Sequence, residues 1–151
     1  MSRNQAAHLE LTWCESEEFI DWQELALLYK LAPLGDKDPS DLKTVFSNSR
    51  FKFFVFEGRK LCAAGRALAD GADCSYICDV AVHPEYQGSG LGKAIVSKLV
   101  AASQGHKKII LYAVPSKVDF YHALGFKRMC TAMAIFARED NAVAMGLITR
   151  D

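Results

Sequence analysis

A short glycine-rich loop carries the residues of this sequence that are best suited to binding an anion. The loop comprises Gln87, Gly88, Ser89, Gly90, Leu91 and Gly92. It follows an apolar run with strand character, residues 75–82, and leads into an amphipathic run, residues 91–103. Small residues let the backbone approach a ligand closely, and the free N–H groups of a first helical turn point at its oxygens. We therefore expect a phosphate-bearing ligand at this loop.

The spacing of the glycines excludes the two commonest phosphate-binding loops. A nucleoside-triphosphate loop needs Gly-x-x-x-x-Gly-Lys-Ser/Thr, whereas the glycines here are closer together and Lys93 is followed by Ala94. A dinucleotide-binding loop needs Gly-x-Gly-x-x-Gly near the first strand, whereas this loop lies in the middle of the chain. A plain connector is the remaining structural alternative. Three glycines would be unfavourable in a mere connector, because each loses much conformational entropy on folding.

The elements around the loop describe a mixed α/β sheet. Ser16 with its following acidic residues predicts a helix that ends by Pro33, and Asp38-Pro39 predicts the start of a second one. Further helices are expected at 91–103, 115–124 and 139–145, and strands at 8–13, 51–56, 61–68, 75–82, 109–114 and 126–137. The strands of residues 51–82 would form an antiparallel meander, and residues 75–114 a strand–helix–strand crossover. This order is neither Rossmann-like nor flavodoxin-like.

Size and composition limit the class of protein. With 151 residues the chain is expected to be one domain, and 18 Lys plus Arg balance 18 Asp plus Glu. This balance gives no basic excess for a nucleic acid, and no apolar run is long enough to span a bilayer. The polar N-terminus has no signal-peptide pattern, so a cytoplasmic location is expected. The five cysteines lack Cys-x-x-Cys spacing, so we expect reduced thiols and no metal site.

Two segments together resemble the GNAT superfamily of N-acetyltransferases. Residues 79–92 are similar to its acetyl-CoA motif, whose core, Gln/Arg-x-x-Gly-x-Gly/Ala, is matched by Gln87, Gly90 and Gly92. Residues 120–126 are similar to its Phe-Tyr-x-x-x-Gly-Phe segment. The resemblance covers residues 51–137. It implies a single N-acetyltransferase domain, residues 1–151, with a mostly antiparallel central sheet that is flanked by helices and whose central strands splay apart.

The resemblance also implies how acetyl-CoA, the acetyl donor, would bind. The backbone of Val80, Ala81 and Val82 would bind the pantetheine arm as an added strand would bind. The backbone amides of the glycine loop and of the residue after it would hold the pyrophosphate. They belong to Gln87, Gly88, Ser89, Gly90, Leu91, Gly92 and Lys93. The side chain of Lys93 is either a counter-charge for the phosphates or a solvated helix residue.

Two residues are candidates for catalysis in this resemblance. Tyr121 would act as the general acid, because its ordinary pKa near ~10 keeps it protonated when the thiolate of CoA leaves. Asp79 would act as the base directly or through water, or else be a polar residue that bonds a neighbouring loop. His83 is titratable but precedes a proline, as turn residues often do. Tyr76 and Val114 depart from the family pattern, which places a carboxylate and an asparagine there in many members.

The sequence leaves the acceptor open. We expect transfer to a primary amine of a small molecule; the alternatives are a protein or peptide N-acetyltransferase, and an acyl-CoA-binding module without turnover. An apolar acceptor wall with acidic residues nearby is one interpretation of the first 50 residues, and ordinary core packing is the other. The wall would use Trp13, Phe19, Trp22, Tyr29 and Leu34. The alternating segment 126–137 could pair with a second copy in a homodimer.

Overall fold

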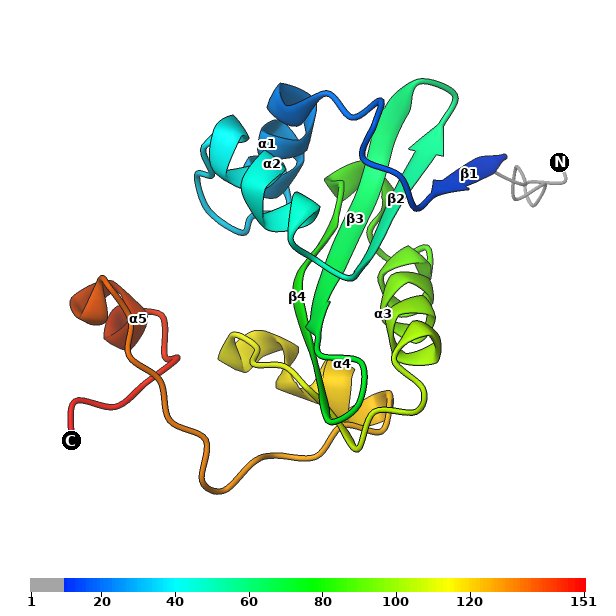
Figure 1. The fold of residues 1–151 in the computed structure, drawn as a ribbon. Helices are drawn as coiled ribbons and strands as arrows, with labels where there is room; N and C mark the ends of the chain where they lie inside the picture. The colour runs from blue at the N-terminus through cyan, green and yellow to red at the C-terminus, as the bar shows by residue number, and fades with distance from the viewer. Residues whose placement is uncertain (1–9) are drawn as a thin grey trace, which may run out of the picture. The chain divides into compact units, whose positions relative to one another are not determined.

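The computed structural model describes residues 10–151 (Figure 1), and the chain divides into two compact units, residues 1–110 and 111–151. The described part of the first unit contains a five-stranded sheet and three α-helices. The second unit contains the 3₁₀ turn η2 (Pro115–Lys117) and the short helices α4 (Val118–Ala123) and α5 (Glu139–Ala144). The glycine loop therefore lies in the first unit and the segment 120–126 in the second.

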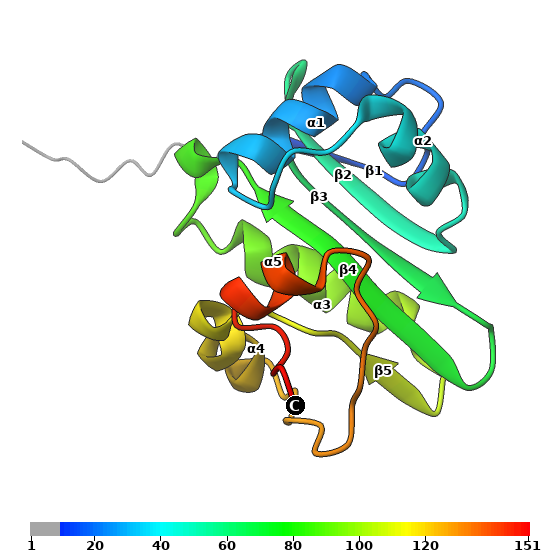
Figure 2. The same cartoon turned by 90° about the vertical axis from the view of Figure 1, so that its left-hand side faces the viewer.

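The sheet of the first unit has the strand order β1-β2-β3-β4-β5 (Figure 2). Its strands are β1 (Leu11–Cys14), β2 (Phe51–Glu57), β3 (Lys60–Ala69), β4 (Cys74–Val82) and β5 (Lys108–Ile110). The first four pair antiparallel in turn, and β4 pairs with β5 in parallel. The predicted meander and the crossover are both present, and the fold class is the predicted mixed, mostly antiparallel sheet with flanking helices.

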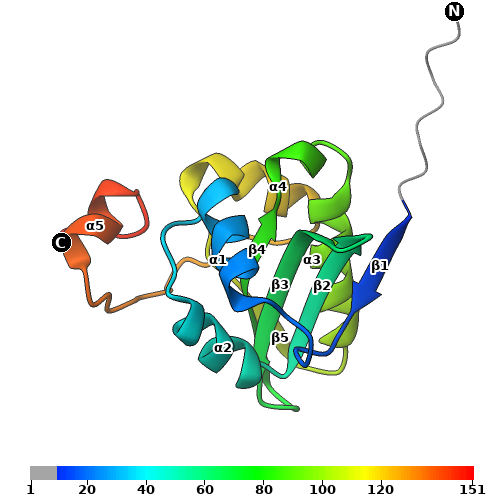
Figure 3. The ribbon, with the colours of Figure 1, turned by 90° about the horizontal axis from the view of Figure 1, so that it is seen from above.

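Helices cover both faces of this sheet. Helices α1 (Trp22–Leu31) and α2 (Pro39–Ser47) lie on one face, and α3 (Leu91–Ala102) lies on the other (Figure 3). Asp38 caps α2 as predicted, since its carboxylate accepts hydrogen bonds from the N–H groups of Ser40 and Asp41. No helix among residues 10–151 combines the length and apolar character that crossing a membrane requires.

The predicted start of the first helix at Ser16 is wrong. The carboxylate of Asp21 caps α1 instead, accepting hydrogen bonds from the N–H groups of Gln23 at 3.0 Å and Glu24 at 3.2 Å. Ser16 forms a separate turn, in which its hydroxyl accepts a hydrogen bond from the N–H of Glu18. Both residues are suitable caps, and Asp21 directly precedes the run whose apolar side chains are buried against the sheet.

The main core lies between the sheet and the helix pair α1 and α2. Tyr29, Phe46 and Phe54 are fully buried, and the rings of Phe46 and Phe54 lie 5.1 Å apart. On the opposite face, α3 packs closely on Gly65 of β3. A Cβ atom at Gly65 would lie 2.7 Å from Cγ2 of Ile95, so this glycine lets the helix approach the sheet.

The strand predictions near the end of the chain fail in part. Of the expected strand 109–114, only residues 109 and 110 belong to β5. The expected strand 126–137 does not form, and the side chains of Met133 and Ile135 there are almost fully exposed. Alternation of apolar and polar residues favours a strand only where a neighbouring strand supplies the hydrogen bonds. No such partner is present for this segment among residues 10–151.

Candidate functional site

A β-bulge shapes the part of β4 that leads to the glycine loop. The register runs from Ala64 opposite Ala81 to Arg66 opposite Cys78, so that Asp79 and Val80 share Gly65 as their partner. Asp79 has a φ of 55°, in the left-handed region that residues other than glycine seldom adopt. A bulge bends its strand and changes the direction of the residues that follow. The bulge therefore sets the direction of residues 80–82.

Three side chains from other elements hold Asp79 in this conformation. The hydroxyl of Tyr29 donates a hydrogen bond of 2.6 Å to the backbone carbonyl of Asp79. The Nε of Arg66 donates one of 2.8 Å to its Oδ2, and the Nζ of Lys37 lies 3.5 Å from its Oδ1. Burial, together with the charge of Asp79, raises the pKa of Tyr29 well above its ordinary value, so the hydroxyl stays a donor.

Cys78 does not serve as a nucleophile at neutral pH in this environment. It directly precedes Asp79 and is partly buried. Burial raises the pKa of its thiol to about 11, and the nearby positive charge of Arg66, which lowers the pKa, offsets only part of this effect. The thiolate is the reactive form of cysteine, so this residue remains an unreactive thiol.

Within the described part of the first unit, no strand pairs with the outer edge of β4 beside residues 80–82, and we call this stretch the open edge. Its parallel pairing with β5 stops at Tyr76 and Ile110, although β4 continues to Val82. The N–H of His83 donates to the carbonyl of Cys62, on the β3 side. Because backbone groups alternate along a strand, those of Ala81 also point to β3, and those of Val82 and Val80 point to the open side. Of the three residues predicted to bind pantetheine by their backbone, Val80 and Val82 face this edge, although the carbonyl of Val82 already accepts a hydrogen bond from the side chain of Gln87.

The glycine loop connects the 3₁₀ turn η1 (Pro84–Tyr86) to α3 and presents free backbone donors. Gly88 and Gly90 have φ values of 80° and 88°, and Gly90 precedes α3 without a side-chain cap. The amides of Gln87 and Ser89 are already used, since they donate to the carbonyls of Pro84 and Tyr86. Five amides have no acceptor within residues 10–151: those of Gly88, Gly90, Leu91, Gly92 and Lys93. This set of donors at a helix N-terminus fits a pyrophosphate.

The side chain of Gln87 has a structural position that the sequence pattern did not predict. Its Nε2 donates hydrogen bonds of 3.0 Å to the carbonyls of both Ala32 and Val82. Ala32 follows α1, and Val82 ends β4. Gln87 therefore links the glycine loop to the connection between α1 and α2, residues 32–38.

Tyr86 fixes the other side of the loop. Its hydroxyl donates a hydrogen bond of 2.9 Å to Oε1 of Glu57, and the Nζ of Lys60 lies 5.3 Å from the centre of its ring. The carbonyl of Tyr86 accepts hydrogen bonds from both the N–H and the hydroxyl of Ser89. Sequence reasoning missed Glu57 and Lys60, which lie about 30 residues earlier in the hairpin of β2 and β3.

The structure places Tyr121 in helix α4 of the second unit. Its ring makes edge contacts with Phe120 and Phe126, at centroid distances of 5.0 and 5.9 Å. Gly125, with a φ of 96°, ends this helical segment and lets the N–H of Phe126 donate back to the carbonyl of Tyr121. Burial raises the pKa of Tyr121, so its hydroxyl stays protonated at neutral pH. That state is the one a general acid needs.

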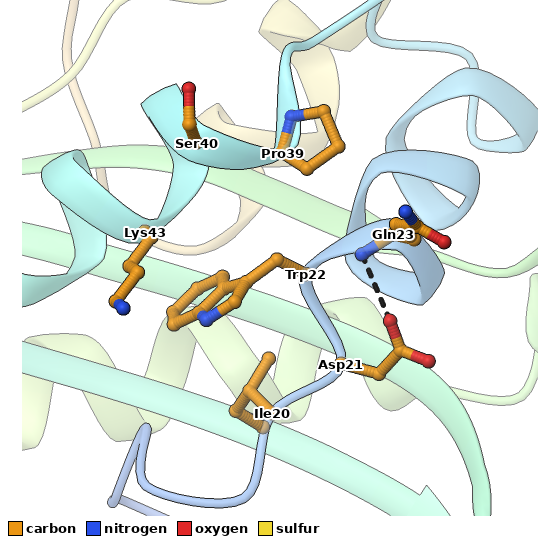
Figure 4. A pocket seen from close by; sticks show the side chains of 7 residues that line it. All are labelled: Ile20, Asp21, Trp22, Gln23, Pro39, Ser40 and Lys43. Carbon is orange, nitrogen blue, oxygen red and sulfur yellow. Dashed lines mark hydrogen bonds between the residues drawn. The ribbon is translucent and has the colours of Figure 1, made fainter.

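A separate cavity of about 420 Å³ lies where the N-termini of α1 and α2 meet (Figure 4). It is lined by Ile20, Asp21, Trp22, Gln23, Pro39, Ser40 and Lys43. Of the aromatic residues interpreted as an acceptor wall, only Trp22 lines it, whereas Tyr29 is buried in the core and Phe19 is exposed. The residues of that wall therefore do not gather around this cavity.

The residues of the first unit can bind an anion and a cation but offer no evident metal site. Within residues 10–151, no group of three or more His, Cys, Asp or Glu side chains is arranged to hold a metal ion. The anion site consists of backbone amides at the start of α3. The cation site consists of the Asp79 carboxylate, which two cations already contact.

Comparison with known proteins supports one family. Residues 49–128 match the family model of an acetyltransferase (GNAT) domain. GCN5-related N-acetyltransferase 2, chloroplastic, of Arabidopsis thaliana is 49% identical over 71 residues, which are 46% of this chain and 28% of that protein. Serotonin N-acetyltransferase 2, chloroplastic, of Oryza sativa subsp. japonica is 46% identical over 66 residues, 42% of this chain and 33% of that protein. The chain thus spans a third or less of the length of these two curated relatives.

Solved structures share the fold. A GNAT family acetyltransferase from Streptococcus pneumoniae TIGR4 superimposes with a TM-score of 0.72, covering 85% of this chain and 98% of the other. Its sequence identity to this chain is 22%. At that identity the likeness describes the fold, and the chemistry has to be argued from the residues of this chain.

Proposed function

Because the chain belongs to the GNAT family of acetyltransferases, we propose that it transfers an acetyl group from acetyl-CoA directly to a primary amine of a small molecule. The observation that carries this proposal is the set of five free amides at the start of α3. It lies next in the chain to the open edge of β4. A donor with both a pyrophosphate and an amide-containing arm would use both features.

Two parts of the first unit would bind acetyl-CoA. The amides of Gly88 and Gly90 to Lys93 would hold the pyrophosphate, and Ser89 would support the loop through Tyr86. The backbone groups of Val80 and the N–H of Val82 would pair with the pantetheine arm along the open edge, with Ala81 bonded to β3 behind them. Gln87 would position the loop rather than contact the cofactor through its side chain.

The transfer itself requires one acid and one proton acceptor. The nitrogen of the neutral amine attacks the thioester carbonyl, so that a C–N bond forms and the C–S bond breaks. In this proposal the hydroxyl of Tyr121 gives a proton to the leaving thiolate, and a backbone N–H of residues 80–82 polarises the carbonyl. Asp79 receives the proton that the amine loses, directly or through a water molecule.

A thiol-release assay with a panel of amines tests this proposal. The panel contains serotonin, because a relative carries that name, with spermidine, an aminoglycoside and peptides that offer an N-terminus or a lysine. We expect turnover with a free small amine and none with acetyl-CoA alone. Turnover of peptides only would favour the protein N-acetyltransferase. Tight binding of acetyl-CoA without thiol release for any amine would favour the acyl-CoA-binding module and contradict transfer.

Three further expectations belong to the same proposal. We propose that residues 1–151 act as one acetyltransferase domain, with a cytoplasmic location and with a homodimer as a possible assembly. The names of both curated relatives include the word chloroplastic, so the location is best tested by imaging the tagged full chain. Sedimentation of the purified chain would test the assembly.

A further inference from the structure

The ammonium group of Lys37 lies in a site that would suit any primary ammonium ion. Its Nζ is 3.5 Å from Oδ1 of Asp79 and 5.3 Å from the centre of the Tyr29 ring. A carboxylate together with an aromatic face is the combination that recognises alkylammonium groups in proteins. The chain therefore fills an ammonium site with one of its own side chains.

The two cations on Asp79 are held very differently. The side chain of Arg66 is 12% exposed, donates to Asp79 at 2.8 Å and to the hydroxyl of Ser49 at 3.3 Å, and covers the ring of Phe46. Lys37 is 28% exposed, and its longer contact comes from the connection between α1 and α2. An ion pair of this length between a flexible, partly exposed lysine and a carboxylate contributes less free energy than the shorter, more buried pair of Arg66. Lys37 is therefore the cation that a ligand could replace, while Arg66 remains in place.

The site also lies next to the predicted position of the acetyl donor. Asp79 directly precedes residues 80–82, whose open edge would bind the pantetheine arm. The side chain of Asp79 is 20% exposed, so its Oδ1 can be reached from solvent once Lys37 moves. The described contacts thus place an ammonium site at the start of the segment that would bind the donor.

We propose that Lys37 occupies the ammonium site of the acceptor, and that a cationic amine displaces it from Asp79 and the Tyr29 ring before transfer. The identification of this ligand as the acceptor rests on the proposed function, whereas the ammonium site rests on the contacts. Lys37 is then a specificity-determining residue. It competes with the acceptor, which takes its place as an ammonium ion and gives one proton to water before its neutral nitrogen attacks the thioester.

The variant Lys37→Gln tests this competition, and Lys30→Gln is its matched control. Lys30 is an exposed lysine in the last turn of α1. We expect Lys37→Gln to lower the KM for serotonin roughly threefold or more, in line with the loss of a weak competing ion pair. The Kd of acetyl-CoA should not change, and Lys30→Gln should leave both values unchanged. An unchanged or higher KM in Lys37→Gln would overturn the proposal.

A second measurement does not depend on turnover. Benzyltrimethylammonium carries a fixed positive charge and cannot be acetylated, and its Kd can be measured by calorimetry. We expect it to bind Lys37→Gln more tightly than the unaltered chain, and to show no such gain when Asp79→Asn is combined with Lys37→Gln. Asparagine tolerates the left-handed conformation of residue 79, so this variant keeps the bulge.

The two measurements separate the two proposals. If no amine is acetylated but Lys37→Gln binds benzyltrimethylammonium more tightly, the ammonium site stands and the proposed transfer fails. If serotonin is acetylated but Lys37→Gln has the same KM and the same Kd as the unaltered chain, the transfer stands and the role of Lys37 is refuted.

Discussion

The glycine loop and the bulge of β4 follow one another in the chain but are built from different groups. The loop offers backbone N–H groups, and its shape depends on positive φ values at Gly88 and Gly90. The bulge is held by the side chains of Tyr29 from α1, Lys37 from the connection between α1 and α2, and Arg66 from β3. A backbone site tolerates many side chains, whereas a site held by side chains changes with each of them. The glycine loop is therefore a generic site, and the bulge is specific to this chain.

The largest expected effect is the loss of the fixed cation at the bulge. Arg66→Ala would leave the mostly buried carboxylate of Asp79 without its closer partner, so we expect the free energy of unfolding to fall by about 3 kcal/mol. Urea denaturation measures this change. Arg59→Ala, an exposed arginine in the turn between β2 and β3, is the control and should stay within about 0.5 kcal/mol. Equal losses for both variants would mean that the bulge does not depend on its side chains.

The removal of the proposed acid should affect turnover alone. Tyr121→Phe keeps the ring contacts to Phe120 and Phe126, so we expect folding and acetyl-CoA affinity to persist. The kcat should fall roughly 100-fold, equal to about 2.7 kcal/mol.

The pH profile gives an independent check on the same acid. Tyr121 acts in its protonated form, and burial raises its pKa above the ordinary value of 10.0. The kcat of the unaltered chain should therefore decline only above pH 10, and Tyr121→Phe should lack this decline. A full-rate Tyr121→Phe enzyme would remove Tyr121 from the mechanism.

A third change tests whether the loop depends on its backbone. Space around Gly90 is open, so an added methyl group would act only through the φ of 88°. We expect Gly90→Ala to destabilise the chain by about 1–2 kcal/mol and to weaken acetyl-CoA binding, because the amides would turn. Gly92→Ala is the contrast: Gly92 lies within α3, where alanine should stabilise the helix by roughly 0.5–1 kcal/mol. Thermal unfolding and calorimetry measure both, and a destabilising Gly92→Ala would contradict the distinction.

The smallest effect is expected for a side chain of the same loop. Lys93→Ala keeps the amide of residue 93 and removes only an exposed ammonium group. If the backbone holds the pyrophosphate, the Kd of acetyl-CoA should rise by less than about threefold in 0.15 M salt. A much larger rise would assign the phosphate contact to the side chain, and the loop would then be as specific to this chain as the bulge.

The strand–loop–helix arrangement around the glycine loop could be predicted from the sequence because its signals are local. The glycines of the loop, the strand before it and the helix after it lie within 30 residues, and Asp38 caps α2 from the adjacent position. The partners of Asp79 could not be found in this way. Tyr29 lies 50 residues away in the sequence and Arg66 lies 13 away. One signal was present, since a charged Arg66 within an apolar strand must have a partner when it is buried.

The failures have a similar physical cause. Segment 126–137 has the alternation of a strand, but pairing depends on a neighbouring strand that a local pattern does not reveal. Ser16 and Asp21 are both good caps, and the choice between them depends on which following residues the sheet buries. Local rules thus predicted most of the elements and the conformation of the glycine loop, and tertiary contacts decided the rest.

The side chain of Gln87 couples the glycine loop to the connection between α1 and α2. One of its two hydrogen bonds joins the glycine loop to the connection that carries Lys37, and the other joins the loop to the end of β4. If acetyl-CoA binds at the loop as proposed and shifts this connection through Gln87, it changes the affinity of the proposed ammonium site for an amine. By thermodynamic linkage, the amine then changes the affinity for acetyl-CoA by the same factor. One amide group thereby offers a route by which the two proposed substrates can change each other's affinity.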